Sequence, residues 1–163
     1  MKNVIESYLE NNNIFLKVLL QSVFNLEIKN VTFLGECKLK KITEYRFNLL
    51  KYNIVLEDFS NYTIFIKLVD KDKIEESLFC YWFFCEEYYG LNSRLYIPKA
   101  NIINLENNSF KTQYNMAIFN KNNILWKNSL LSFISLKEYC RKHLIKMDKN
   151  SKELNKSLFI AII

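Results

Sequence analysis

Apolar residues recur along the chain with two different periods, and these periods divide it into helices and strands. Between residues 4 and 24 they stand three or four positions apart, which is typical of one face of a helix. Asn11, Asn12 and Asn13 interrupt this pattern, and asparagine is unfavourable inside a helix but favourable at its first position. We therefore expect a short first helix and a second helix that begins near Asn13.

Beyond residue 26 the apolar residues alternate with polar ones and are rich in β-branched and aromatic types. This alternation predicts three consecutive strands, at about 30–38, 45–57 and 62–69. The phase shifts within the second strand near Leu50 and Lys51, which indicates a β-bulge there. In the third strand the aliphatic residues share one face, and Phe65 and Lys67 share the other.

An aromatic-rich helix follows the third strand. Asp70 and Asp72 favour a helix start, and Gly90 is a natural stop. Asparagine-rich turns then separate three further strands from one another, and a basic helix follows them; these elements are expected at 101–105, 112–120, 129–136 and 136–147. The tail is polar up to Leu158, and the apolar segment 158–163 is expected to be a final strand or a contact segment.

The order of these elements indicates the fold class. Helix, three strands, helix and three strands favour an α/β or α+β protein, with a mixed central β-sheet and helices on its faces. The chain has 163 residues and is 50% hydrophobic, which suits one domain with a substantial core. We expect a single domain, 1–163, in which the basic helix and tail, 137–163, can form an appended part.

The charge of the chain is positive and comes mostly from lysine. The net charge is +6, and the only arginines are Arg46, Arg94 and Arg141. This balance predicts a weak, salt-sensitive attraction to polyanions. The alternative is that the lysines only solvate the surface. With 2 glycines in the chain, a glycine-rich phosphate-binding loop is excluded.

Two further features bear on location. No segment has the apolar core of a signal peptide, and no apolar run has the length of a membrane span. The 4 cysteines show no pairing pattern, so reduced thiols are expected. The sequence therefore predicts a cytoplasmic protein without a membrane contact.

Short motifs follow one another in an order found in a known group of nucleases. Arg46-Phe47-Asn48 lies on the second predicted strand, Ile64-Phe65-Ile66-Lys67 on the third, and Tyr81-Trp82 on the helix after it. The chain thereby resembles the Rpn-like, transposase-associated branch of the PD-(D/E)XK nuclease superfamily. The resemblance implies a PD-(D/E)XK-like fold. In that superfamily an Asp and a Glu hold Mg²⁺ for phosphodiester hydrolysis, and a Lys or Gln two residues after the Glu orients the water.

The chain departs from this pattern at the residues that hold the metal. Asn48 stands at the position of the Asp and Phe65 at that of the Glu, so only Lys67 fits its role. The family's N-terminal motif and longer C-terminal region also lack counterparts. The resemblance therefore implies a degenerate, truncated member without catalytic residues, metal or cofactor. Mg²⁺ enters only if other acids regroup into a site, and the candidates are Glu44, Glu57, Asp58 and Asp70.

Zinc binding and histidine-dependent catalysis have little support in the sequence. Cys140 and His143 have the spacing of half a zinc site, but no second half lies nearby. His143 is also the only histidine, which argues against Ser-His-Asp and Cys-His catalysis.

The aromatic helix and the basic residues are the candidate binding surfaces. The helix has more aromatic residues than one sheet face needs, so its rings either fill the core or bind a partner or a second copy. The candidate partner-binding residues are Phe79, Trp82, Phe83 and Tyr89. The candidate nucleic-acid-binding residues, which can equally be solvated surface, are Lys67, Arg141, Lys142 and Lys146.

Three functions therefore remain open. The first is an inactive nuclease-like domain that binds a protein partner, as an accessory, decoy or inhibitor protein of a phage or mobile element. The second is nucleic-acid binding without cleavage. The third is a Mg²⁺-dependent DNA endonuclease with relocated acidic ligands.

Overall fold

The computed structural model describes residues 13–38, 48–88, 99–119, 125–143 and 152–163. The helices are α2 (Asn13–Phe24), α3 (Ile74–Tyr88), α4 (Leu136–Lys142) and a 3₁₀ helix (Lys152–Asn155). The strands are β1 (Ile28–Lys38), β2 (Asn48–Leu56), β3 (Asn61–Asp70), β4 (Lys99–Asn107), β5 (Lys111–Phe119), β6 (Leu125–Ser135) and β7 (Lys156–Ile162). None of the helices in these ranges is long and apolar enough to cross a membrane.

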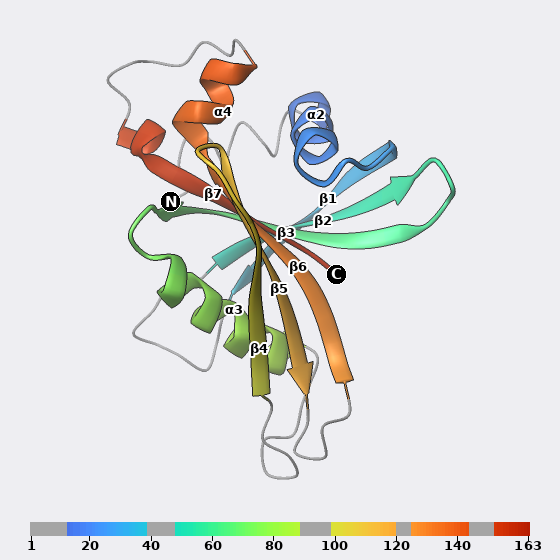
Figure 1. The fold of residues 1–163 in the computed structure, drawn as a ribbon. Helices are drawn as coiled ribbons and strands as arrows, with labels where there is room; N and C mark the ends of the chain where they lie inside the picture. The colour runs from blue at the N-terminus through green and yellow to red at the C-terminus, as the bar shows by residue number, and fades with distance from the viewer. Residues whose placement is uncertain (1–12, 39–47, 89–98, 120–124, 144–151) are drawn as a thin grey trace.

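The strands form one twisted sheet in the order β1-β2-β3-β7-β6-β5-β4 (Figure 1). Every neighbouring pair is antiparallel. The fold is therefore α+β, and the expectation of a mixed sheet is wrong for these strands. The reason lies in the connections. Two meanders, β1-β2-β3 and β4-β5-β6, supply only antiparallel pairs, and β7 runs opposite to both of its neighbours.

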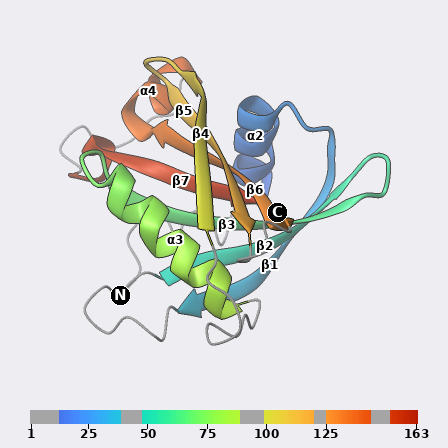
Figure 2. The same cartoon turned by 60° about the horizontal axis from the view of Figure 1, so that its bottom comes forward.

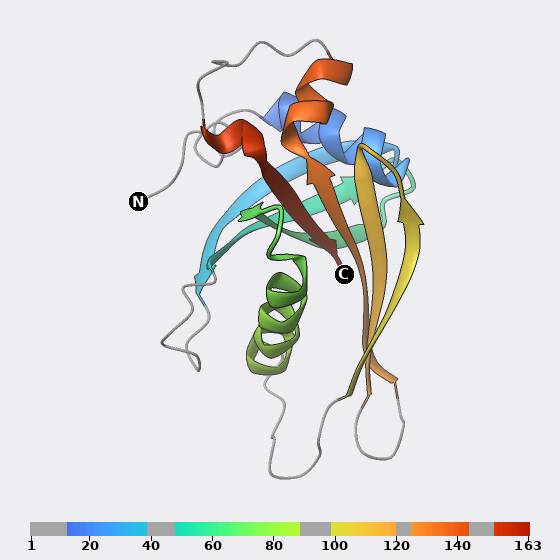
Figure 3. The same cartoon turned by 60° about the vertical axis from the view of Figure 1, so that its left-hand side comes forward.

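Helices cover both faces of the sheet, and each face has its own core. Figure 3 shows α2 and α4 on one side and α3 on the other. Alternation along β3 explains the division, because Ile64 and Ile66 pack in the core under α2 and α4, whereas Phe65 packs in the core under α3. Ser129 of β6 ties the second core to α3, since its Oγ lies 2.9 Å from the hydroxyl oxygen of Tyr81.

The last strand in sequence is the central strand of the sheet. β7 pairs with β3 on one side, from Lys156 to Ile162, and with β6 on the other, from Ser157 to Ile162. Residues 157–161 are all buried, because both faces of this strand are covered. The tail thus contains the strand that joins the two meanders.

Most predicted elements are confirmed where the structure describes them. The second helix begins at Asn13, and each of the six predicted strands is present with bounds shifted by a few residues. The predicted bulge at Leu50-Lys51 is wrong. Leu49 and Leu50 are both buried because opposite faces of β2 are covered, and the irregularities lie in β1, between Ile28 and Asn30 and between Phe33 and Gly35. The predicted first helix lies outside the described residues, as do residues 144–147 of the predicted basic helix; α4 itself ends at Lys142, with His143 as its C-cap.

Candidate functional site

The three positions that the nuclease resemblance singles out lie on β2 and β3. Asn48 and Lys67 are brought together, since the Nζ of Lys67 donates a hydrogen bond of 3.4 Å to the backbone oxygen of Asn48. Phe65 is fully buried, with its ring centroid 5.0 Å from that of Phe84 on α3. The ring of Phe65 therefore packs in the core under α3, and no carboxylate stands at this position.

Lys67 lies on the α3 face of the sheet, near a thiol and a carboxylate. Burial raises the pKa of the Cys80 thiol, Glu76 raises it further, and the positive charge of Lys67 lowers it. The thiol is thus protonated at neutral pH, and a neutral thiol is a poor nucleophile and a poor metal ligand. The positive charge of Lys67 thus lies near a neutral thiol and the carboxylate of Glu76.

The acids considered for a relocated metal site do not converge. Asp70 lies within ion-pair distance of Lys73 and Lys156, at 3.8 and 3.9 Å. Asp58 accepts hydrogen bonds from Ser60 in the β2–β3 turn, which lowers the pKa of its carboxyl. Within the described ranges no three His, Cys, Asp or Glu side chains gather closely enough to hold a metal ion. Glu44 lies outside these ranges.

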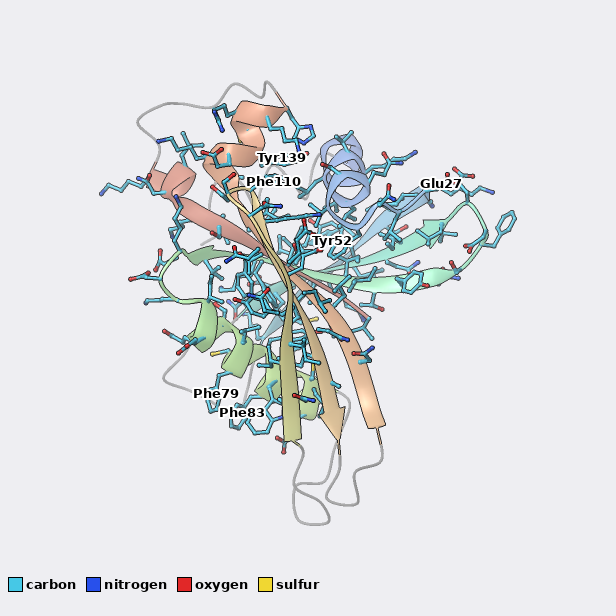
Figure 4. The ribbon with its side chains drawn as sticks, viewed as in Figure 1. Glu27, Tyr52, Phe79, Phe83, Phe110 and Tyr139 are labelled. Carbon is cyan, nitrogen blue, oxygen red and sulfur yellow. The ribbon has the colours of Figure 1, made fainter. Side chains whose placement is uncertain are left out.

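Aromatic side chains form a surface cluster on α3, which we name the α3 surface. Its ring centroids lie 4.6 to 5.8 Å apart, and it consists of Phe79, Trp82 and Phe83. The side chain of Phe79 is 50% exposed, whereas the other two rings are partly packed against the core. Figure 4 shows Phe79 and Phe83 on α3, far from Phe110 and Tyr139. The fourth predicted contact residue, Tyr89, lies outside the described residues.

Two polar features accompany the α3 surface. The indole N–H of Trp82 is buried and has no hydrogen-bond acceptor among the described residues. Such an unpaired donor costs about 1–3 kcal/mol. Glu75 and Glu76 in the first turn of α3 are exposed, and α3 contains no basic residue. The helix therefore presents rings beside negative charge.

On the opposite face of the sheet, α4 presents the predicted basic residues Arg141 and Lys142. Its first turn is capped by Ser135, whose Oγ accepts a hydrogen bond from the backbone N–H of Glu138. Both basic residues are exposed in the last turn, where they are favoured by the helix dipole. Lys67 lies on the other face, so the structure does not place these cations on one surface. Lys146 lies outside the described residues.

Arg141 and Lys142 line a groove of about 560 Å³, which we name the α4 groove. The end of α2, the β4–β5 turn and α4 form its walls, and Figure 2 shows this turn beside α4. The lining residues are Ser22, Glu106, Asn108, Ser109, Phe110, Lys111, Glu138, Arg141 and Lys142. The sequence indicated only the α4 basic residues of this set.

Aromatic stacking joins the turn to α4 beside the groove. The rings of Phe110 and Tyr139 are almost parallel, with centroids 5.9 Å apart. His143 lies 4.4 Å from the Tyr139 ring and shares a hydrogen bond with Ser22 of α2. Burial and the neighbouring Lys142 lower the pKa of His143, whereas burial raises the pKa of Tyr139 to about 12. Both side chains are therefore uncharged at neutral pH and serve as packing groups.

Comparison with known proteins places the chain beside no established family. No family model, no curated protein and no solved structure matches it.

Proposed function

We propose that this chain is a binding protein that docks a positively charged protein partner on the α3 surface, as an accessory or inhibitor protein rather than as an enzyme. One observation carries the proposal: Phe79 is 50% exposed within the ring cluster of the α3 surface. Aromatic residues of this kind dominate the binding energy at protein interfaces.

The exposed ring of Phe79 contributes to the energy of binding at this surface. Covering the exposed part of an aromatic ring contributes on the order of 1–2 kcal/mol, at roughly 25 cal/mol per Å² of apolar area. The exposed ring of Phe79 is also suited to stacking with arginine or lysine.

The charges beside the rings define the chemistry of the partner. Glu75 and Glu76 are exposed in the first turn of α3, and no basic residue lies on this helix. A partner that presents arginine or lysine would pair with these carboxylates and lie over the rings. A second copy of the chain is a different occupant, and light scattering across a concentration series distinguishes it.

The nuclease-like ancestry is part of the proposal but does not carry it. Its support is the set of sequence motifs, together with the contact between Lys67 and the backbone of Asn48. The antiparallel order of the described strands adds no support to it. A plasmid-nicking assay with Mg²⁺ and Mn²⁺ addresses the alternative enzyme directly: we expect no metal-dependent cleavage above that of Lys67→Ala.

A peptide selection tests the docking proposal. We expect display selection on the full chain to enrich peptides that combine Arg or Lys with an apolar anchor. Their affinity should fall at least about tenfold in Phe79→Ser, equivalent to 1.4 kcal/mol, and should fall in the Glu75→Gln/Glu76→Gln double variant. The matched control is Phe59→Ser, because Phe59 is a 68% exposed ring on the distant β2–β3 turn. Enriched peptides that bind wild type and Phe79→Ser equally would overturn the proposal.

A further inference from the structure

The α4 groove has the size and the fixed walls of a small-molecule site. Its volume of about 560 Å³ lies within the roughly 300–1,000 Å³ range of ligand pockets. The turn that forms one wall is held from within, because Oδ1 of Asn108 accepts the backbone N–H groups of Phe110 and Lys111 at 2.8 and 2.7 Å. The turn is also tied to the start of α4, since the N–H of Ser135 donates to the carbonyl of Phe110 at 2.9 Å.

The lining of the groove contains one more positively charged side chain than negatively charged side chains. Lys111 forms an ion pair of 3.4 Å with Glu106 on the turn, and Arg141 pairs with Glu138 on α4. Lys142 forms no ion pair within the described residues; its Nζ lies 4.8 Å from the centroid of the Phe110 ring. Three cations thus face two carboxylates, and the lining holds only one aromatic ring.

This lining discriminates between classes of ligand. The excess cation argues against a metal ion, and the scarcity of apolar walls argues against a lipid or another apolar molecule. Guanidinium and ammonium groups favour a phosphate, whereas the carboxylates of Glu106 and Glu138 accept hydrogen bonds from hydroxyl groups. A molecule that carries a phosphate at one end and hydroxyl groups beside it matches both halves of the lining.

We propose that the α4 groove binds a phosphorylated sugar of about mononucleotide size. Its phosphate lies against Lys142 and Arg141, and its hydroxyl groups lie against Glu106 and Glu138. Arg141 can turn towards the phosphate because its side chain is 77% exposed. Lys142 can approach the phosphate without breaking an ion pair to another described residue. The ligand is either a free nucleotide or a nucleotide of a single-stranded nucleic acid, since both present this chemistry.

Titration of the full chain with ribose, ribose 5-phosphate and adenosine monophosphate, followed by calorimetry or NMR, tests the proposal. We expect saturable binding of both phosphorylated probes, and ribose alone should bind far more weakly. Lys142→Gln and Arg141→Gln should each weaken binding by at least about tenfold. The matched control is Lys137→Gln, which removes an exposed cation from the same helix but outside the groove and should leave the affinity unchanged.

Two outcomes overturn the proposal: no saturable binding of either phosphorylated probe, or an equal loss of affinity in the Lys137 and Lys142 variants. Because both lysines are exposed, thermal denaturation of the variants should match that of wild type, so a loss of binding is not a loss of folding. A short single-stranded oligonucleotide separates the two sources. If it binds more tightly than the mononucleotide and competes with it, the ligand belongs to a nucleic acid; otherwise the free nucleotide is the ligand.

Discussion

At the residue scale, Phe65 shows how closely the packing of one side chain bears on function. Its ring is fully buried and contacts Phe84 and Tyr81 of α3, at centroid distances of 5.0 and 6.5 Å. The α3 face of the sheet is therefore packed with rings around Phe65, the position at which the proposed nuclease-like ancestry would place a metal-binding Glu. A carboxylate here would be buried in apolar surroundings, where its charged form is strongly disfavoured.

Phe65→Glu should consequently destabilise the protein rather than create a metal site. We expect a loss of about 3–5 kcal/mol in the free energy of unfolding, because a buried ring is removed and a carboxyl is placed in the core. Urea denaturation with and without Mg²⁺ measures it. Lys67→Gln, on the same face but half-buried, is the control and should cost less than about 1 kcal/mol. Stabilisation of Phe65→Glu by Mg²⁺ would contradict this account.

His143 should make stability depend on pH. Burial and Lys142 lower its pKa below the ordinary value of 6.5, so the unfolded chain binds the proton more readily than the folded one. The free energy of unfolding should therefore fall as the pH drops through 6.5, and level off below the folded-state pKa. Urea denaturation across this range measures the slope. His143→Gln, which keeps a polar group near Ser22 but does not titrate, should remove this contribution; parallel wild-type and variant curves would refute it.

At the scale of elements, the helices and strands were largely predictable but their faces were only partly so. The alternation in β3 correctly separates Ile64 and Ile66 from Phe65. In β2 the phase shift near Leu50 and Lys51 predicts a bulge only if a single face of the strand is buried. Both faces of the sheet are covered, so Leu49 and Leu50 enter different cores without a bulge.

The irregularity of β1 between Phe33 and Gly35 has a local conformational cause. A substitution at Gly35 tests this explanation. Gly35 has a φ of 109°, and a Cβ built there would meet no atom within 4 Å. Only the backbone conformation therefore opposes a side chain. We expect Gly35→Ala to lower the free energy of unfolding by about 1–3 kcal/mol, measured by urea denaturation. Glu36→Ala, at an exposed position of the same strand, is the control; equal stabilities of the two variants would contradict the explanation.

At the scale of the whole molecule, the strand order could not be read from the sequence. Residues 158–163 were recognised as apolar, but nothing local indicates that β7 enters between β3 and β6. The α4 groove was unpredictable for the same reason. Arg141 and Lys142 could be identified by their charge, whereas Phe110 and Lys111 reach them only through the pairing of β5 with β6 and the hydrogen bond between Ser135 and Phe110.

The central place of β7 predicts which backbone amides are most protected. Hydrogen bonds of β7 to β3 and β6 cannot break without separating the two meanders. Its amides should exchange with solvent only through global unfolding, together with those of β3. The amides of β4, an edge strand whose residues 101–107 are exposed, should exchange faster. Native-state hydrogen exchange measured by NMR checks this order, and faster exchange in β7 than in β4 would contradict it.

The position of β7 also has a consequence for folding during synthesis on the ribosome. The two meanders are each local in sequence and can begin to form while translation continues, but β3 and β6 keep open edges until residues 156–162 have left the exit tunnel. An open edge of this kind can pair with the wrong chain. The nascent polypeptide therefore passes through a stage in which both meanders have been synthesised but the edges of β3 and β6 are still unpaired. Its yield in the cell should depend on chaperones that cover these edges.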